Sequence, residues 1–77
     1  MNRMERIGQR EELRIRRKNI EAEITSHRDS ILASLPLIGK LVDINSEYVM
    51  MLGIKLHERV QELREVNNYI EILERDW

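Results

Sequence analysis

The sequence predicts an all-α protein, an antiparallel two-helix hairpin that dimerises into a four-helix bundle. Apolar residues recur at intervals of three, four and seven, the period of one helix face, instead of alternating as in a strand. The only proline, Pro36, lies between two long periodic stretches, where it favours a break. The 77 residues are 42% hydrophobic and contain no cysteine, so one domain without disulfides fits. We expect residues 1–77 to form a single helical-hairpin domain.

The first helix is predicted over about residues 4–34. Its core face consists of five apolar residues spaced by seven, four, seven and four: Leu13, Ile20, Ile24, Ile31 and Leu35. No Gly or Pro interrupts residues 11–33. Pro36 disfavours helical geometry at the residue before it, so the helix should end there.

The second helix is predicted over about residues 44–76, after an apolar connection over about residues 35–43. Its heptad core positions hold Val49, Leu52, Leu56, Leu63, Val66, Ile70, Leu73 and Trp77. Only Arg59 interrupts this series. The pattern is typical of coiled-coil-like packing against the first helix.

Two starts of the second helix are open. Ser34 can cap a helix that begins near Pro36, whereas Asp43, Asn45 and Ser46 can cap one that begins about ten residues later. Gly39 would lie inside the longer helix, which slightly favours the later start.

Each predicted helix carries a second, thinner apolar stripe. The stripes consist of Ile7, Ile15 and Ala22 on the first helix and of Met50, Ile54, Tyr69 and Ile72 on the second. A chain of this size without disulfides commonly completes its core by oligomerising. We therefore expect a homodimer, with two hairpins forming an antiparallel four-helix bundle.

The charges are balanced overall but divided between the halves. Thirteen Lys and Arg against fourteen Asp and Glu give a net charge of −1, whereas residues 1–40 hold an excess of basic side chains and residues 41–77 an excess of acidic ones. A row of arginines follows one side of the first helix: Arg3, Arg6, Arg10, Arg14 and Arg17. In an antiparallel hairpin this row faces the acidic second helix, so we expect internal ion pairs.

The alternative use of the row is nucleic-acid contact through Arg10, Arg14, Arg17 and Lys18, in a dimer that docks on a phosphate backbone. Acidic residues lie among the arginines and reduce the positive charge of this region. The first helix also has no aromatic side chain that could stack on a base. We therefore do not expect a nucleic acid as the partner.

The sequence lacks the patterns of catalytic and cofactor sites. His27 and His57 have no second His or Glu at the spacing of a zinc or di-iron site. Gly39 and Lys40 lack the rest of a phosphate-binding loop. We expect no cofactor, no metal and no enzymatic activity.

The predicted connection is unusually apolar, since five large aliphatic residues lie between positions 35 and 42. Connections are normally polar, so these residues cover the end of the bundle, form a buried extension of the second helix, or form a docking surface for another protein. The candidate docking residues are Leu37, Ile38, Leu41, Met50 and Met51. This pattern favours a non-enzymatic protein–protein interaction module, such as an adaptor, a small chaperone or an assembly component.

The most apolar window, residues 31–54, is interrupted by Lys40, Asp43 and Glu47, so it does not resemble a membrane span. The first ten residues carry several charges and no apolar run of the kind a secretory signal needs. We expect a cytoplasmic protein with no membrane contact.

Overall fold

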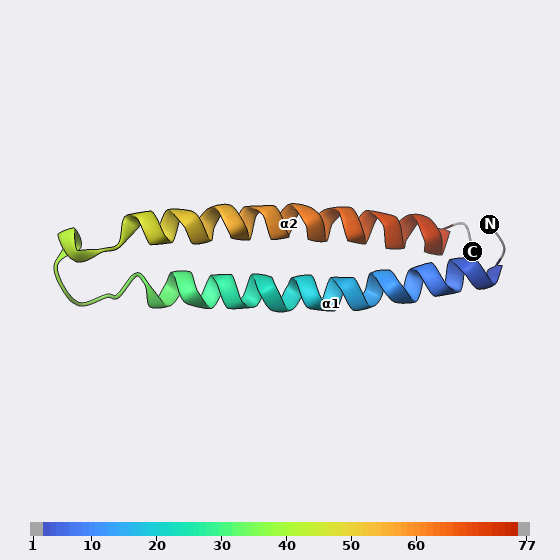
Figure 1. Cartoon of the computed structure of the whole chain (residues 1–77), viewed down its shortest axis with the longest axis horizontal. Coiled ribbons are helices and arrows are strands. Elements are labelled where there is room, and N and C mark those ends of the chain that lie inside the picture. The colour runs from blue at the N-terminus through green and yellow to red at the C-terminus, as the bar shows by residue number, and fades with distance from the viewer. Residues whose placement is uncertain (1–2, 76–77) are drawn as a thin grey trace.

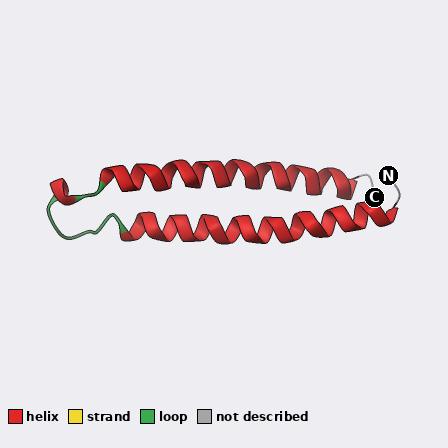
Figure 2. Ribbon diagram, in the orientation of Figure 1, coloured by secondary structure: helices red, strands yellow, loops and turns green. Residues whose placement is uncertain are grey.

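The computed structural model describes residues 3–75 as a hairpin of two long antiparallel helices. Helix α1 spans Arg3–Ala33 and helix α2 spans Ser46–Arg75, with a single 3₁₀ turn at Leu41–Asp43 between them. The molecule is a rod of 60 × 14 × 14 Å, with the connection at one end and the outer ends of both helices at the other (Figure 1). Within the described residues the only irregular backbone lies at the connection (Figure 2). The predicted all-α hairpin is confirmed.

Helix α1 ends where Pro36 begins to restrict the chain. The Ser34 amide still donates to the Ser30 carbonyl at 3.0 Å, and the Leu35 amide reaches only back to the Leu32 carbonyl at 3.3 Å. Leu35 was predicted to lie on the core face of the first helix, and this is wrong. It lies beyond the last helical residue and is exposed, because the following proline excludes it from helical geometry.

Helix α2 has the later of the two starts, and Asn45 caps it. The Asn45 side-chain oxygen accepts a hydrogen bond from the Tyr48 amide at 3.1 Å, and the Asn45 backbone carbonyl accepts one from the Val49 amide at 3.1 Å. Glu47 lies in the first turn, where the helix dipole favours negative charge. The cap satisfies a backbone donor that would otherwise lack a partner at this end.

The core is a single seam between the two helices. Ile20 on α1 packs with Val66 and Ile70 on α2, and three half-buried residues surround them: Leu13, Ile24 and Leu63. Leu52 is the remaining fully buried apolar residue of the described chain and lies nearer the connection. The α1 residues belong to the predicted core face of the first helix. The α2 residues belong to the predicted heptad, whose last member, Trp77, lies outside the described residues.

The rod leaves much of its surface in contact with solvent. Its accessible area is 6271 Å², whereas a compact monomer of this mass exposes only about 5,000 Å². The second stripes are part of this excess, since Ile15 on α1 and Met50, Ile54, Tyr69 and Ile72 on α2 are all exposed. A lone hairpin therefore buries one stripe of each helix and leaves the other uncovered.

Two isoleucines on α2 provide a matched test of the seam. Ile70 is 4% exposed and belongs to the core cluster, whereas Ile72 is 49% exposed. Ile70→Ala should lower the free energy of unfolding by about 2–4 kcal/mol, because it leaves a cavity, and Ile72→Ala by less than about 1 kcal/mol. Urea unfolding followed by circular dichroism measures both. Equal losses would mean that the face of Ile72 is packed as tightly as the seam.

Candidate functional site

The connection end of the rod carries most of the exposed apolar surface. Of the fifteen large hydrophobic residues that are exposed in the described chain, ten lie within residues 32–54. We call this set the apolar tip: Leu32, Leu35, Leu37, Ile38, Leu41, Val42, Tyr48, Met50, Met51 and Ile54. It contains all five candidate docking residues. Of the other five members, Leu35 and Val42 belong to the apolar connection and Ile54 to the second stripe of the second helix, whereas nothing in the sequence pattern singled out Leu32 and Tyr48.

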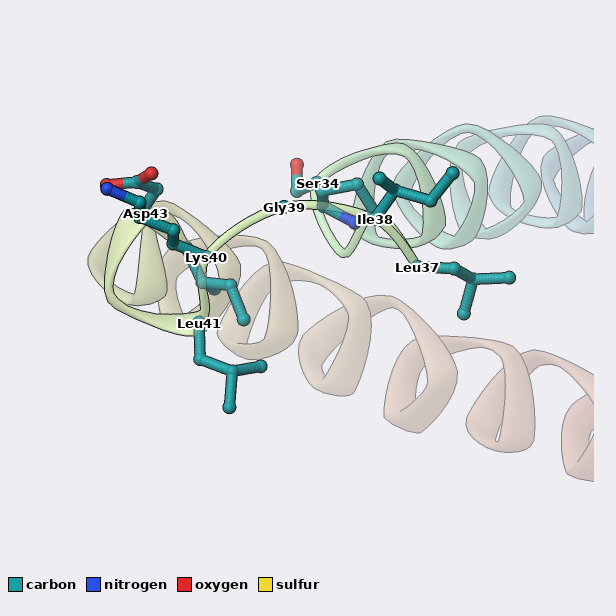
Figure 3. A pocket seen from close by; sticks show the side chains of 9 residues that line it. Ser34, Leu37, Ile38, Gly39, Lys40, Leu41 and Asp43 are labelled. Carbon is teal, nitrogen blue, oxygen red and sulfur yellow. The ribbon is translucent and has the colours of Figure 1, made fainter.

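The connection does not fold back over the end of the hairpin. Leu37 is 103% exposed and Leu41 is 84% exposed, and Ile38 and Val42 are similarly open. Figure 3 shows the side chains of Leu37, Ile38 and Leu41 spread around the loop, where they do not pack together. In the single chain, the interpretation of this segment as a cap over the core is therefore wrong.

Backbone geometry holds the connection in this open form. Gly39 has a φ of +123°, a conformation that side-chain-bearing residues rarely adopt. The Asp43 amide donates to the Lys40 carbonyl at 3.0 Å and the Ile44 amide to the Leu41 carbonyl at 3.3 Å, which forms the 3₁₀ turn. These bonds are local, so the aliphatic side chains are free to contact a partner. The loop also borders a shallow hollow of about 140 Å³.

The rest of the rod, which we call the stem, is held at its margins by ion pairs between the helices. Arg14 Nη2 lies 2.7 Å from Glu74 Oε1, and Arg16 Nη2 lies 2.7 Å from Glu62 Oε1. Arg59 on α2 lies 2.9 Å from Glu62 and 3.6 Å from Glu23 of α1. These side chains are partly solvated, so each pair contributes about 0–1 kcal/mol.

The arginine row does not form an outward basic surface. Arg10, Arg14 and Arg17 are half-buried along the seam side of α1, while Lys18 is exposed. Arg17 Nη1 donates to Asn67 Oδ1 of α2 at 3.5 Å, in addition to the contact of Arg14 with Glu74. Of the four residues proposed for nucleic-acid contact, three therefore lie beside the seam and only Lys18 is exposed to solvent.

One cluster of charged residues was not predicted from the sequence, and it consists of Arg59, Glu62, Glu23 and Arg16. Arg59 was interpreted as a break in the heptad, yet its guanidinium joins carboxylates of both helices. The local spacing of Arg59 and Glu62, three residues apart on a helix, was the available signal. The contact with Glu23 could not be recognised without the register of the two helices.

The two histidines lie in different surroundings. His27 is half-buried and borders a shallow hollow together with Glu23, Lys55, Glu58 and Arg59. His57 is exposed and does not border that hollow. Among residues 3–75 no group of three or more His, Cys, Asp or Glu side chains is arranged to hold a metal ion. The two imidazoles are therefore not brought together as a site.

Comparisons with known proteins give no family to which the chain could be assigned. No family model, no curated protein and no solved structure matches it. In the described part of the chain, neither helix combines the length and apolarity that crossing a bilayer requires.

Glu62 is the carboxylate most strongly influenced by its neighbours. The hydrogen bond from Arg16 lowers the pKa of the Glu62 carboxyl, and the positive charge of Arg59 lowers it further against the opposing effect of partial burial. A carboxyl whose pKa is lower in the folded than in the unfolded chain stabilises the fold above its unfolded pKa. That contribution is lost as the pH falls through the folded pKa.

Glu62→Gln should therefore destabilise the hairpin at neutral pH and have little effect in acid. The free energy of unfolding of the unmodified protein should exceed that of the variant at pH about 7, and the difference should shrink as the pH falls through the folded pKa of Glu62. Thermal or urea unfolding at several pH values measures this. Glu65→Gln is the control, because Glu65 is exposed on the same helix and makes no ion pair with the described residues. A difference independent of pH would contradict the role of the Glu62 charge.

Proposed function

We propose that this protein is a non-enzymatic interaction module, a helical hairpin that self-associates as a homodimer and presents an apolar surface for protein–protein contact. The observation that carries the proposal is the concentration of ten exposed hydrophobic residues in the apolar tip. Soluble monomers rarely expose apolar patches larger than about 300–600 Å² unless a partner covers them.

The small core of the hairpin supports self-association. Only Ile20, Leu52, Val66 and Ile70 are fully buried among the described residues. Domains of this size commonly need disulfides, a metal or oligomerisation to become stable, and the chain has no cysteine. A two-fold dimer that places four helices together closes on itself and covers apolar surface of both copies.

A role as adaptor, small chaperone or assembly component fits the same surface. Met50 and Met51 are both exposed in the apolar tip, and methionine side chains adapt their shape to different partners. The exposed aliphatic residues of the connection extend this surface at the end of the rod. Such a surface recognises apolar segments of proteins and offers no water-excluding pocket for a reaction.

Nucleic-acid binding is the weaker proposal. Arg14 and Arg16 are engaged with Glu74 and Glu62 of α2, so binding a phosphate backbone would require these pairs to break. The stem also carries acidic side chains such as Glu21, close to Arg17 at 3.9 Å. Both observations favour a structural role of the arginines.

Sedimentation equilibrium tests the self-association. At micromolar concentration the unmodified chain should give about twice its mass of 9.3 kDa. The helical signal in circular dichroism should be retained under the same conditions. A stably folded protein that sediments with the mass of one chain would contradict the proposed dimer.

The structural role of the arginines has a separate test. The triple change Arg10→Gln, Arg14→Gln and Arg17→Gln should lower the free energy of unfolding by about 1–2 kcal/mol at low salt and by less at high salt, because exposed pairs are screened. Lys18→Gln is the control, since Lys18 is exposed and outside the ion pairs between the helices. Salt-sensitive, micromolar binding of the unmodified protein to duplex DNA or structured RNA would favour the nucleic-acid function instead.

A further inference from the structure

We infer that two copies of this chain associate tip to tip, with the apolar tip of each copy covering that of the other and the two stems pointing in opposite directions. This inference rests on the proposed self-association and specifies its surface and geometry. The four helices then run together only near the two connections, and the remainder of each stem stays in solvent.

The apolar tip exposes the side chains that such a dimer covers. Seven of its ten side chains are more than half exposed, and four of them are more than 80% exposed, namely Leu37, Ile38, Leu41 and Val42. A standard stable interface takes roughly 800 Å² from each partner. Several of the ten side chains also lie on one helix, since Met50 and Met51 are adjacent in one turn of α2 and Ile54 lies in the next turn. The tip of a second copy is a partner of the same size that exposes the same apolar residues.

The outer face of the stem is a poor alternative surface. Ile15 lies among charged side chains of α1, namely Glu11, Arg14, Arg17, Lys18 and Glu21. Ile72 and Tyr69 lie beside Glu65 and Asn68 on α2. Covering these isolated apolar residues along the whole rod would also remove their charged neighbours from water, which costs more than the apolar contact contributes.

The few charges of the apolar tip allow an ion pair with a second copy. Residues 32–54 contain only three charged side chains, Lys40, Asp43 and Glu47. None of these three makes an ion pair with any residue of the described chain, although charged residues of the stem do so repeatedly. In a two-fold interface the same surface meets itself, so Lys40 of each copy can pair with Glu47 of the other.

Distances between labels distinguish this geometry from its alternatives. The chain has no cysteine, so Asp43→Cys and Glu12→Cys each provide a single site for a nitroxide spin label, at the tip and in the stem respectively. Asp43→Cys also leaves Glu47 available to Lys40. Double electron–electron resonance measures the distance between the two labels of each dimer.

In the tip-to-tip dimer, labels at residue 43 should lie within about 30 Å of each other, and labels at residue 12 should lie more than about 50 Å apart. Full-length antiparallel pairing would separate the residue-43 labels by nearly the rod length of 60 Å. Parallel pairing of the stems would bring both kinds of label close together. Either of these two results would overturn the tip-to-tip geometry.

Matched serine variants test the same surface without labels. Leu37→Ser with Leu41→Ser should weaken the dimer about tenfold or more, because both side chains lie at the centre of the proposed interface. The control, Ile15→Ser with Ile72→Ser, changes two exposed residues of the stem and should alter the dissociation constant less than about threefold. Sedimentation equilibrium gives both constants, and circular dichroism verifies that both variants remain helical.

The outcomes separate this inference from the proposed function. If the unmodified protein is a monomer, self-association and the tip-to-tip geometry are both wrong. If it is a dimer that the stem variant disrupts and the tip variant does not, only the tip-to-tip geometry is wrong. A dimer disrupted by the tip variant alone, with the label distances given above, supports both.

Discussion

The structure depends on one apolar seam between two helices. In a hairpin each helix has a single neighbour, so a residue either faces that neighbour or faces solvent. Ile20, Val66 and Ile70 form the centre of this seam, and Leu13, Ile24 and Leu63 pack against them. Hydrophobic burial is thus confined to one stripe per helix, which explains why the rod exposes more surface than a compact chain of its mass.

Polar residues at the seam give the two helices a defined register. Arg59 occupies a heptad core position yet stays about one third exposed, because its long side chain reaches the margin and contacts Glu23 and Glu62. Arg17 reaches Asn67 in the same way from α1. A shift of one helix by a turn would separate these partners. Polar groups of this kind add little stability, but they disfavour wrong registers.

The sequence was sufficient to predict the hairpin because both of its determinants are local. The helical period of the apolar residues and the restriction by Pro36 require no knowledge of distant contacts. The start of α2 was ambiguous because Ser34 and Asn45 are both suitable caps, and only the hydrogen bond from the Tyr48 amide decides between them. The exposure of the side chains in the connection also could not be predicted from the sequence. The backbone angles around Gly39 determine where its side chains point, and no periodicity describes them.

The division between stem and apolar tip links folding to association. Charges of the stem are paired across the seam, so association there would disturb Arg14 with Glu74 and Arg16 with Glu62. Association at the apolar tip leaves these pairs intact and removes exposed aliphatic side chains from water. Because only the folded hairpin presents that surface, a dimer stabilises the folded state by mass action. The proposed dimer therefore connects the short core with the exposed tip, because in it the second copy supplies the burial that one seam cannot provide.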